Sequence, residues 1–253
     1  MKLLTINTHS IVERNYKNKL NIFVDTIAKI KPDIIAMQEV NQVKLVSKYN
    51  HAKEVVTRLE KLGIKYYYKW LPIKLGYGMF DEGIAILSIW PIEEITDYFI
   101  SDVKDYGNWK TRKVLGVKVK DMWFYSVHMG WWNDNDEPFI NQWNKLIDNI
   151  DMNNKIWLLG DFNSEAGVIG EGYDLVCSSG FYDSYKLAKH KDDGITVGKK
   201  IDGWKHSDVE GMRIDYIFSN YKANVLSSTV VFNGENYDIV SDHYGVLIEV
   251  MED

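Results

Sequence analysis

The chain has 253 residues, a formal net charge of −6 and one cysteine. This length suits one large α/β domain, and no linker, repeat or low-complexity tract divides the sequence, so we predict a single domain over residues 1–253. A negative charge without a Lys/Arg-rich stripe argues against a partner held mainly through a polyanionic backbone, so nucleic acid is a less favoured partner.

The first quarter of the chain alternates strands and helices, and it contains neither a signal peptide nor a membrane span of about 20 apolar residues. We therefore expect a cytoplasmic protein with no membrane partner. Apolar residues from Leu20 to Ile30 recur at helical spacing until Pro32, and Gly63 suits the end of a second helix. The predicted elements are a strand at Lys2–Thr8, a helix at Leu20–Ile30, a strand at Ile34–Met37 ending at Gln38-Glu39, and a helix at Ala52–Leu62.

From residue 65 onward, short β-like runs separated by turn residues predict a mainly antiparallel meander. These runs are Tyr66–Leu71, Gly83–Ser88, Ile92–Ile100, Arg112–Val119 and Met122–Val127. The remaining predicted elements are a helix at Glu137–Ile150, a strand at Ile156–Leu159, a helix at Tyr173–Ser178, and strands at Ile214–Phe218, Val225–Phe232 and Gly245–Val250. Helices between two groups of strands predict an α/β four-layer sandwich, with two mainly antiparallel β-sheets packed face to face and helices outside.

Hard metal ligands and acid/base groups follow several of the predicted strands. Asn7, Glu39 and His128 each follow one strand, and Asp161 follows another with Asn163 two residues later. Such groups on loops held by a rigid core are typical of functional sites. Two more polar clusters, around Asp215 and at Asp242-His243, border the final strands.

Five of these segments, in this order, resemble the motifs of the endonuclease/exonuclease/phosphatase superfamily. They are Gln38-Glu39, Ser126-Val127-His128, Gly160-Asp161-Phe162-Asn163, Arg213-Ile214-Asp215-Tyr216 and Ser241-Asp242-His243. That superfamily includes deoxyribonuclease I, exonuclease III, sphingomyelinases and inositol-polyphosphate phosphatases. The resemblance covers the whole chain and implies the same four-layer sandwich with a phosphoesterase that depends on a divalent metal, Mg²⁺ or Mn²⁺.

Hydrolysis of a phosphoester needs a cation, an activated water and donors to the phosphate oxygens. Glu39 and the amide oxygen of Asn7 are hard ligands suited to Mg²⁺. Asp242 either joins a metal position or supports His243.

The resemblance also implies the acid/base groups. His243 pairs with Asp215, Asp161 orients or deprotonates the attacking water, and Asn163 and His128 donate to the phosphate oxygens. Whether His243 or Asp161 is the formal base stays open at this stage.

The substrate depends on loops. Arg112 begins a strand after a polar loop, where the family often has a phosphate-facing arginine; an ordinary surface arginine is the alternative. After His128, the adjacent Trp131 and Trp132 can face a neutral sugar. The acids that follow them, Asp134, Asp136 and Glu137, would repel a long polyanion, or they belong to an acidic helix N-terminus.

This loop and the segment Ile201-Asp202-Gly203-Trp204 resemble a bacterial branch that contains maltose 6'-phosphate phosphatase. We therefore predict a phosphatase acting on a small phosphorylated sugar, with Arg112, Trp131, Trp132 and Trp204 binding the substrate. The alternative is a DNA nuclease or repair enzyme on the same core. A non-catalytic binding module would be expected to have lost an acid/base residue, and none is missing.

Overall fold

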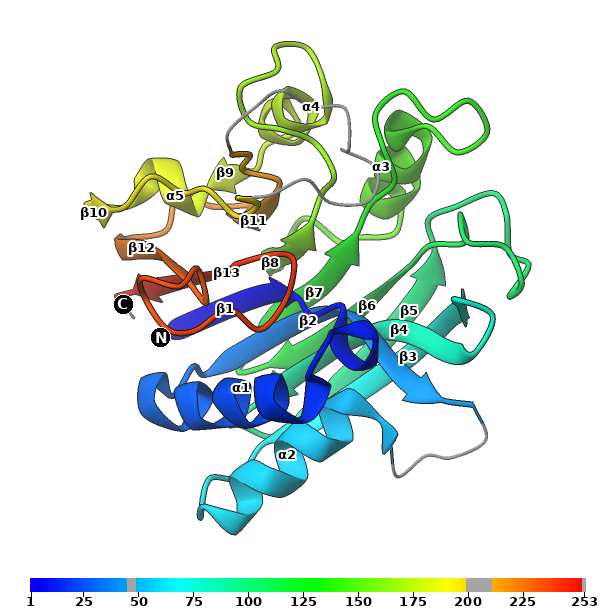
Figure 1. Ribbon diagram of the computed structural model, residues 1–253. Coiled ribbons are helices and arrows are strands. Elements are labelled where there is room, and N and C mark those ends of the chain that lie inside the picture. Colours follow the sequence, from blue (N-terminus) through cyan, green and yellow to red (C-terminus); the bar gives the residue numbers. More distant parts are fainter. Residues whose placement is uncertain (45–48, 199–210, 252–253) are drawn as a thin grey trace.

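Two β-sheets pack face to face, and helices cover both outer faces (Figure 1). The structure is a computed structural model that describes residues 1–44, 49–198 and 211–251. Helices α1 (Tyr16–Ile30) and α2 (His51–Lys61) cover one sheet, and α3 (Phe139–Asp148) and α4 (Gly172–Ser178) cover the other. Two short helices, η1 (Ser10–Val12) and α5 (Ser184–Leu187), lie in connections. No helix within these ranges is long and apolar enough to cross a membrane.

The two sheets have seven and six strands. The first has the order β10 (His190–Lys191), β12 (Val225–Val231), β13 (Gly245–Val250), β1 (Lys2–Asn7), β2 (Ile34–Val43), β4 (Phe80–Ser88) and β3 (Tyr67–Gly76). The second has the order β5 (Glu94–Phe99), β6 (Lys113–Val119), β7 (Met122–His128), β8 (Lys155–Asp161), β11 (Asp215–Ser219) and β9 (Tyr182–Asp183). Most neighbours are antiparallel, and the pairs β1–β2, β7–β8 and β10–β12 are parallel. The predicted four-layer sandwich is confirmed.

Strand alternation sends successive side chains into different cores. Leu3 lies in the core between the sheets, and Leu4 lies in the core under α1 and α2. In the same way, Trp157 points into the central core and Leu158 lies in the core under α3 and α4. Because these strands are apolar on both faces, each sheet is covered on both sides.

The segment predicted as one meander is divided between the sheets. Strands β3 and β4 belong to the first sheet, and β5, β6 and β7 belong to the second. Both edges of β4 are already paired, with β2 and with β3, so the next strand cannot join beside it. The connection crosses the sandwich instead, where Trp90 and Ile92 pack against the central core.

Strand β2 continues past Glu39 to Val43, so the prediction that this carboxylate ends a strand was wrong. The pairing with β4 slips between Met37 and Val40, which leaves an extra residue in β2. Glu39 lies in this bulge with a positive φ of 49°. A bulge re-aims a side chain without ending the strand.

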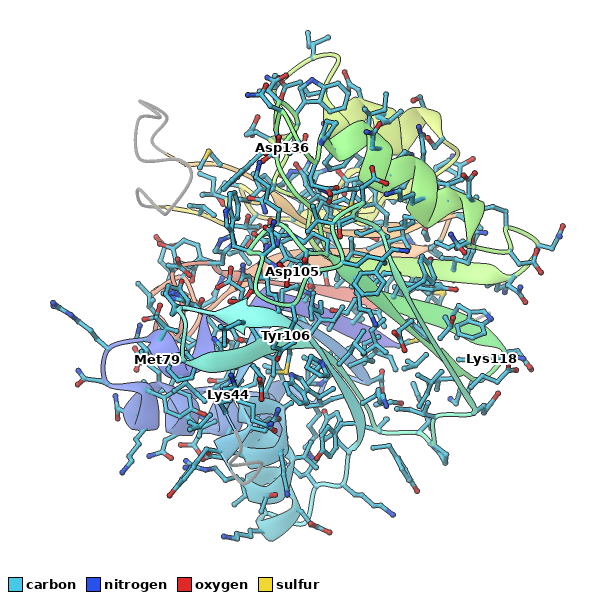
Figure 2. The ribbon with its side chains drawn as sticks, turned by 90° about the vertical axis from the view of Figure 1, so that its right-hand side faces the viewer. Lys44, Met79, Asp105, Tyr106, Lys118 and Asp136 are labelled. Atoms are coloured by element: carbon cyan, nitrogen blue, oxygen red, sulfur yellow. The ribbon has the colours of Figure 1, made fainter. Side chains whose placement is uncertain are left out.

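Three loops share one face of the molecule. Figure 2 labels one residue in each of them: Met79 in the β3–β4 turn, Tyr106 in the β5–β6 loop and Asp136 in the loop before α3. Hydrogen bonds join them: the Tyr106 hydroxyl donates to Asp81 Oδ1 at 2.6 Å, and Lys110 Nζ donates to Asp136 Oδ2 at 2.6 Å. These three loops supply the outer walls of the site described next.

Candidate active site

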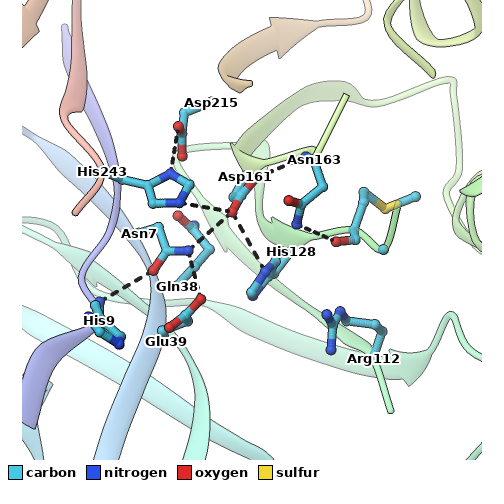
Figure 3. Close-up of polar contacts among 12 residues, drawn as sticks. Asn7, His9, Gln38, Glu39, Arg112, His128, Asp161, Asn163, Asp215 and His243 are labelled. Carbon is cyan, nitrogen blue, oxygen red and sulfur yellow. Dashed lines mark hydrogen bonds and ion pairs between the residues drawn. The ribbon is translucent and has the colours of Figure 1, made fainter. Parts of the chain in front are cut away.

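Polar residues from both sheets meet at one end of the sandwich (Figure 3). The register of the second sheet pairs Asp161, the last residue of β8, with His128 at the end of β7 and with Asp215 at the start of β11. These three side chains therefore start from one row across three neighbouring strands. Asn7 at the end of β1 brings the first sheet to the same place.

Asp161 is the centre of this cluster. Its Oδ2 accepts a hydrogen bond from Asn7 Nδ2 at 3.1 Å, and it lies 3.6 Å from His128 Nε2 and 3.8 Å from His243 Nε2. Burial raises the pKa of Asp161, and the nearby Asp215 raises it further. One carboxylate oxygen thus faces three nitrogen groups.

Asn7 connects Asp161 to Glu39. Its Nδ2 also donates to Glu39 Oε1 at 3.0 Å, and because both neighbours are carboxylates, the amide nitrogen must face them. The amide oxygen accepts from the backbone N–H of His9 at 3.3 Å. In this arrangement Asn7 orients two carboxylates, whereas its oxygen had been expected to be a metal ligand.

His243 and Asp215 form a buried pair. His243 Nδ1 lies 3.0 Å from Asp215 Oδ2, and its other ring nitrogen faces Asp161. Although burial lowers the pKa of His243, the charges of Asp215 and Asp161 outweigh this effect and raise it. Both ring nitrogens therefore act as donors.

His128 differs from His243. Burial, together with the positive charges of Arg112 and Lys74, lowers the pKa of His128 well below its usual value. Its ring is therefore neutral in the folded protein, and one nitrogen can still donate.

Asn163 follows β8 with a positive φ of 46°. Its backbone N–H donates to Asp161 Oδ1 at 2.9 Å, and its Nδ2 donates to the carbonyl of Met129 at 2.9 Å. Asn163 thus fixes Asp161, and it lines the cavity beside it.

Carboxylates crowd around Glu39. Burial raises the pKa of Glu39, and repulsion from Glu82 and Asp242 raises it further. A divalent cation would relieve this repulsion, and the oxygen donors of Glu39 and Asp242 suit Mg²⁺ or Mn²⁺. The chain's residues therefore fit the metal that the family resemblance implies.

A second set of donors comprises Asp161, Asp215 and His243, whose ligand atoms lie within 4.8 Å of one another, close enough to share one ion. His243 Nδ1 is already bonded to Asp215, and Mg²⁺ prefers oxygen ligands. Glu39 and Asp242 are therefore the better match for Mg²⁺.

A cavity of about 320 Å³ opens beside these residues, and a lysine and an arginine lie in its wall. Arg112, for which the sequence left a phosphate ligand and a surface residue as alternatives, is buried and lines the cavity. Lys74, which was not predicted as a site residue, is also buried there, with Nζ 3.2 Å from Glu82 Oε1. A lysine within the apolar run Ile73–Leu75 was the signal that could have found it.

The structure separates the predicted tryptophans. Trp131 lines the cavity, where its ring centroid is 5.5 Å from that of Trp109. Trp132 is partly buried and packs against the core under α3, with its ring centroid 6.0 Å from that of Phe139. Only one of the adjacent pair lines the cavity. Trp204 lies outside the described residues.

The acids of this loop face protein groups. Lys110 Nζ binds Asp134 Oδ1 at 2.8 Å and also Asp136. Glu137 is buried and accepts the backbone N–H groups of Asp102 and Val103. Helix α3 accordingly begins at Phe139 and has no acid in its first turn, so the prediction of a helix from Glu137 was two residues early.

Comparison with known proteins identifies the family. The model of the endonuclease/exonuclease/phosphatase family matches residues 4–243. The solved structure of a protein of this family from Leptotrichia buccalis is 34% identical, with a TM-score of 0.92 and 100% of both chains covered. The chain therefore belongs to the endonuclease/exonuclease/phosphatase family, whose members are generally metal-dependent hydrolases.

More distant solved structures share the fold. They include the mannosyl-6-phosphatase of Bacteroides thetaiotaomicron, at 20% identity and a TM-score of 0.68. An AP endonuclease from Archaeoglobus fulgidus is 18% identical, with a TM-score of 0.69. Both matches cover 100% of each chain. None of the curated proteins compared with the chain matches it.

Proposed function

We propose that this protein is a divalent-metal-dependent phosphatase that hydrolyses a small phosphorylated sugar, of the kind represented by maltose 6'-phosphate. The observation that carries the proposal is the pair of buried cations, Lys74 and Arg112, in the wall of a small cavity beside the acid/base cluster.

The charge of this wall favours a phosphomonoester. A phosphomonoester carries a charge of about −1.5 to −2 at neutral pH, whereas a phosphodiester carries about −1. Arg112 has no carboxylate within salt-bridge distance among the described residues, and Lys74 has one, Glu82. With a divalent cation near Glu39, the positive groups match a terminal phosphate better than a nucleic-acid backbone.

The protein's own groups support a hydrolytic step. Asp161 accepts a proton from the attacking water as the water oxygen bonds to phosphorus. His243 is protonated at both nitrogens because each faces a carboxylate, so it is a poor base, and its positive charge attracts the phosphate. The bond from phosphorus to the sugar oxygen breaks, and that oxygen takes a proton from solvent. The bound cation would supply neutralisation of the phosphate charge.

Two similar structures represent the competing substrates. The mannosyl-6-phosphatase supports a sugar phosphate, and the AP endonuclease supports DNA. The net charge of −6 gives no general attraction for a polyanion, which favours the sugar phosphate.

The test is a screen of the purified protein with Mg²⁺ against hexose phosphates, disaccharide phosphates and plasmid DNA, with Glu39→Gln as the inactive control. We expect phosphate release from sugar phosphates and no cleavage of plasmid at physiological salt. Plasmid degradation without phosphate release from any sugar phosphate would overturn the proposal and favour the nuclease.

A further inference from the structure

An exposed tryptophan lies on the rim of the catalytic cavity. Trp109, in the β5–β6 loop, lines the cavity and keeps 50% of its surface exposed. A large apolar side chain held half in solvent beside a cavity is typical of a recognition surface.

Trp109 is tied to the two cations. Its backbone carbonyl accepts hydrogen bonds from Lys74 Nζ at 2.8 Å and from Arg112 Nη1 at 2.7 Å. The backbone of Trp109 is therefore fixed relative to the groups that we assign to the phosphate, and its side chain lines the same cavity as they do.

Trp131 completes the surface. Its ring is tilted by 53° from that of Trp109. Its Nε1 is buried and has no hydrogen-bond partner among the residues that the structure describes. A buried donor without an acceptor is costly, which suits a site whose ligand carries oxygens.

The surroundings of the two rings are partly apolar, and the charged groups among them are paired. Lys110 bridges Asp134 and Asp136, and its Nζ lies 5.4 Å from the centroid of the Trp109 ring. Tyr77, exposed by 53%, lines the cavity from the β3–β4 turn. Met79, exposed by 62%, belongs to the same turn, and Figure 2 shows it on the same face as the β5–β6 loop. Such a surface suits a neutral group with apolar faces and polar edges.

We propose that Trp109 and Trp131 bind the sugar part of the substrate, and that Trp109 holds a second, unphosphorylated ring. The inference rests on the proposed phosphatase function and deepens it, because it names the side chains that would distinguish a phosphorylated disaccharide from a phosphorylated hexose. We assign no part in recognition to Trp132, because it packs against the core under α3 and does not line the cavity.

The test compares a disaccharide 6'-phosphate with the matching hexose 6-phosphate. Trp109→Ala keeps the backbone carbonyl that Lys74 and Arg112 bind. We expect the KM for the disaccharide phosphate to rise about tenfold, which corresponds to about 1.4 kcal/mol, while kcat and the KM for the hexose phosphate stay within about twofold. Trp109→Phe should restore most of the loss because it keeps an aromatic face. Trp132→Phe is the matched control and should leave both KM values unchanged.

A second readout uses binding of unphosphorylated maltose by titration calorimetry, which does not require turnover. Wild type and Trp132→Phe should bind maltose, and Trp109→Ala should bind it at least about tenfold more weakly. If hexose phosphates are hydrolysed but Trp109→Ala affects neither maltose binding nor the disaccharide KM, the tryptophan proposal is wrong and the phosphatase stands. If maltose binds through Trp109 but no phosphomonoester is hydrolysed, the phosphatase assignment is wrong and the sugar surface stands.

Discussion

Replacing Lys74 by methionine should impair both the fold and the activity, for separate reasons. Lys74 and Glu82 have side chains exposed by only 10% and 9%, and their charged atoms lie 3.2 Å apart. Breaking a buried ion pair by removing one partner costs about 3–5 kcal/mol, because the remaining charge is left uncompensated. We expect Lys74→Met to lower the free energy of unfolding by this amount.

The activity effect comes from the phosphate. A hydrogen bond to a charged group contributes about 1.5–3 kcal/mol, so losing the ammonium should lower kcat/KM for a phosphomonoester about 10- to 150-fold. Because ground state and transition state both carry the phosphate charge, most of this loss should be an increase in KM.

The double variant Lys74→Met/Glu82→Gln separates the two effects. It removes both charges, so urea denaturation should show most of the stability restored, while phosphate-release assays should show kcat/KM still reduced. Glu82→Gln alone keeps the ammonium and should retain a KM close to wild type. If the double variant recovered kcat/KM together with its stability, Lys74 would act only on the fold, and the proposal that Lys74 and Arg112 bind the phosphate would be wrong.

Three other predictions test the site and its support. Glu39→Gln should raise the Mg²⁺ concentration needed for half-maximal activity and lower turnover, because an amide loses the charge that holds the cation; full activity in the presence of a chelator would contradict this. Asp161→Asn and His243→Ala should each lower kcat by at least about 10²-fold while the fold is retained, and the double variant should lose less than the product of the two. His243→Ala should also lower the melting temperature, because Asp215 loses its buried partner. Strictly multiplicative losses of kcat would show that the two groups act independently. His51 is buried, its Nε2 has no hydrogen-bond partner within the described ranges, and burial lowers its pKa to about 3. As the pH falls below about 6.5, His51 takes up a proton in the unfolded chain but not in the folded protein. The contribution of His51 to the free energy of unfolding is therefore complete above about pH 6.5, and the free energy of unfolding should be lower by about 2 kcal/mol at pH 5. Denaturation of wild type and His51→Gln across pH 7 to 5 measures the difference, and parallel slopes would refute the assignment.

Local patterns in the sequence were enough for the architecture. Alternating apolar runs, a proline after Lys31 and a glycine after Leu62 predicted the main strands and the first two helices, because these signals act within a few residues. Gly63 has a positive φ of 77° and follows the end of α2, as expected for a glycine that ends a helix. The ordered motifs also indicated which residues gather at one end of the sandwich, since strand ends in one sheet meet at one edge.

The tertiary structure alone decided how these residues are used. Strand pairing placed Glu39 in a bulge, since the slip depends on β4, which lies more than 40 residues away. Trp131 and Trp132 are neighbours of one type, yet one ring packs against Phe139 at the edge of the core under α3 and the other lines the cavity. Lys74 lies in β3 and Trp109 lies in the β5–β6 loop, and the hydrogen bond between them forms only when the chain folds. Residue type and local spacing carry no record of such long-range contacts, so the sequence determined the fold and the kind of chemistry, and folding determined which side chains surround the substrate.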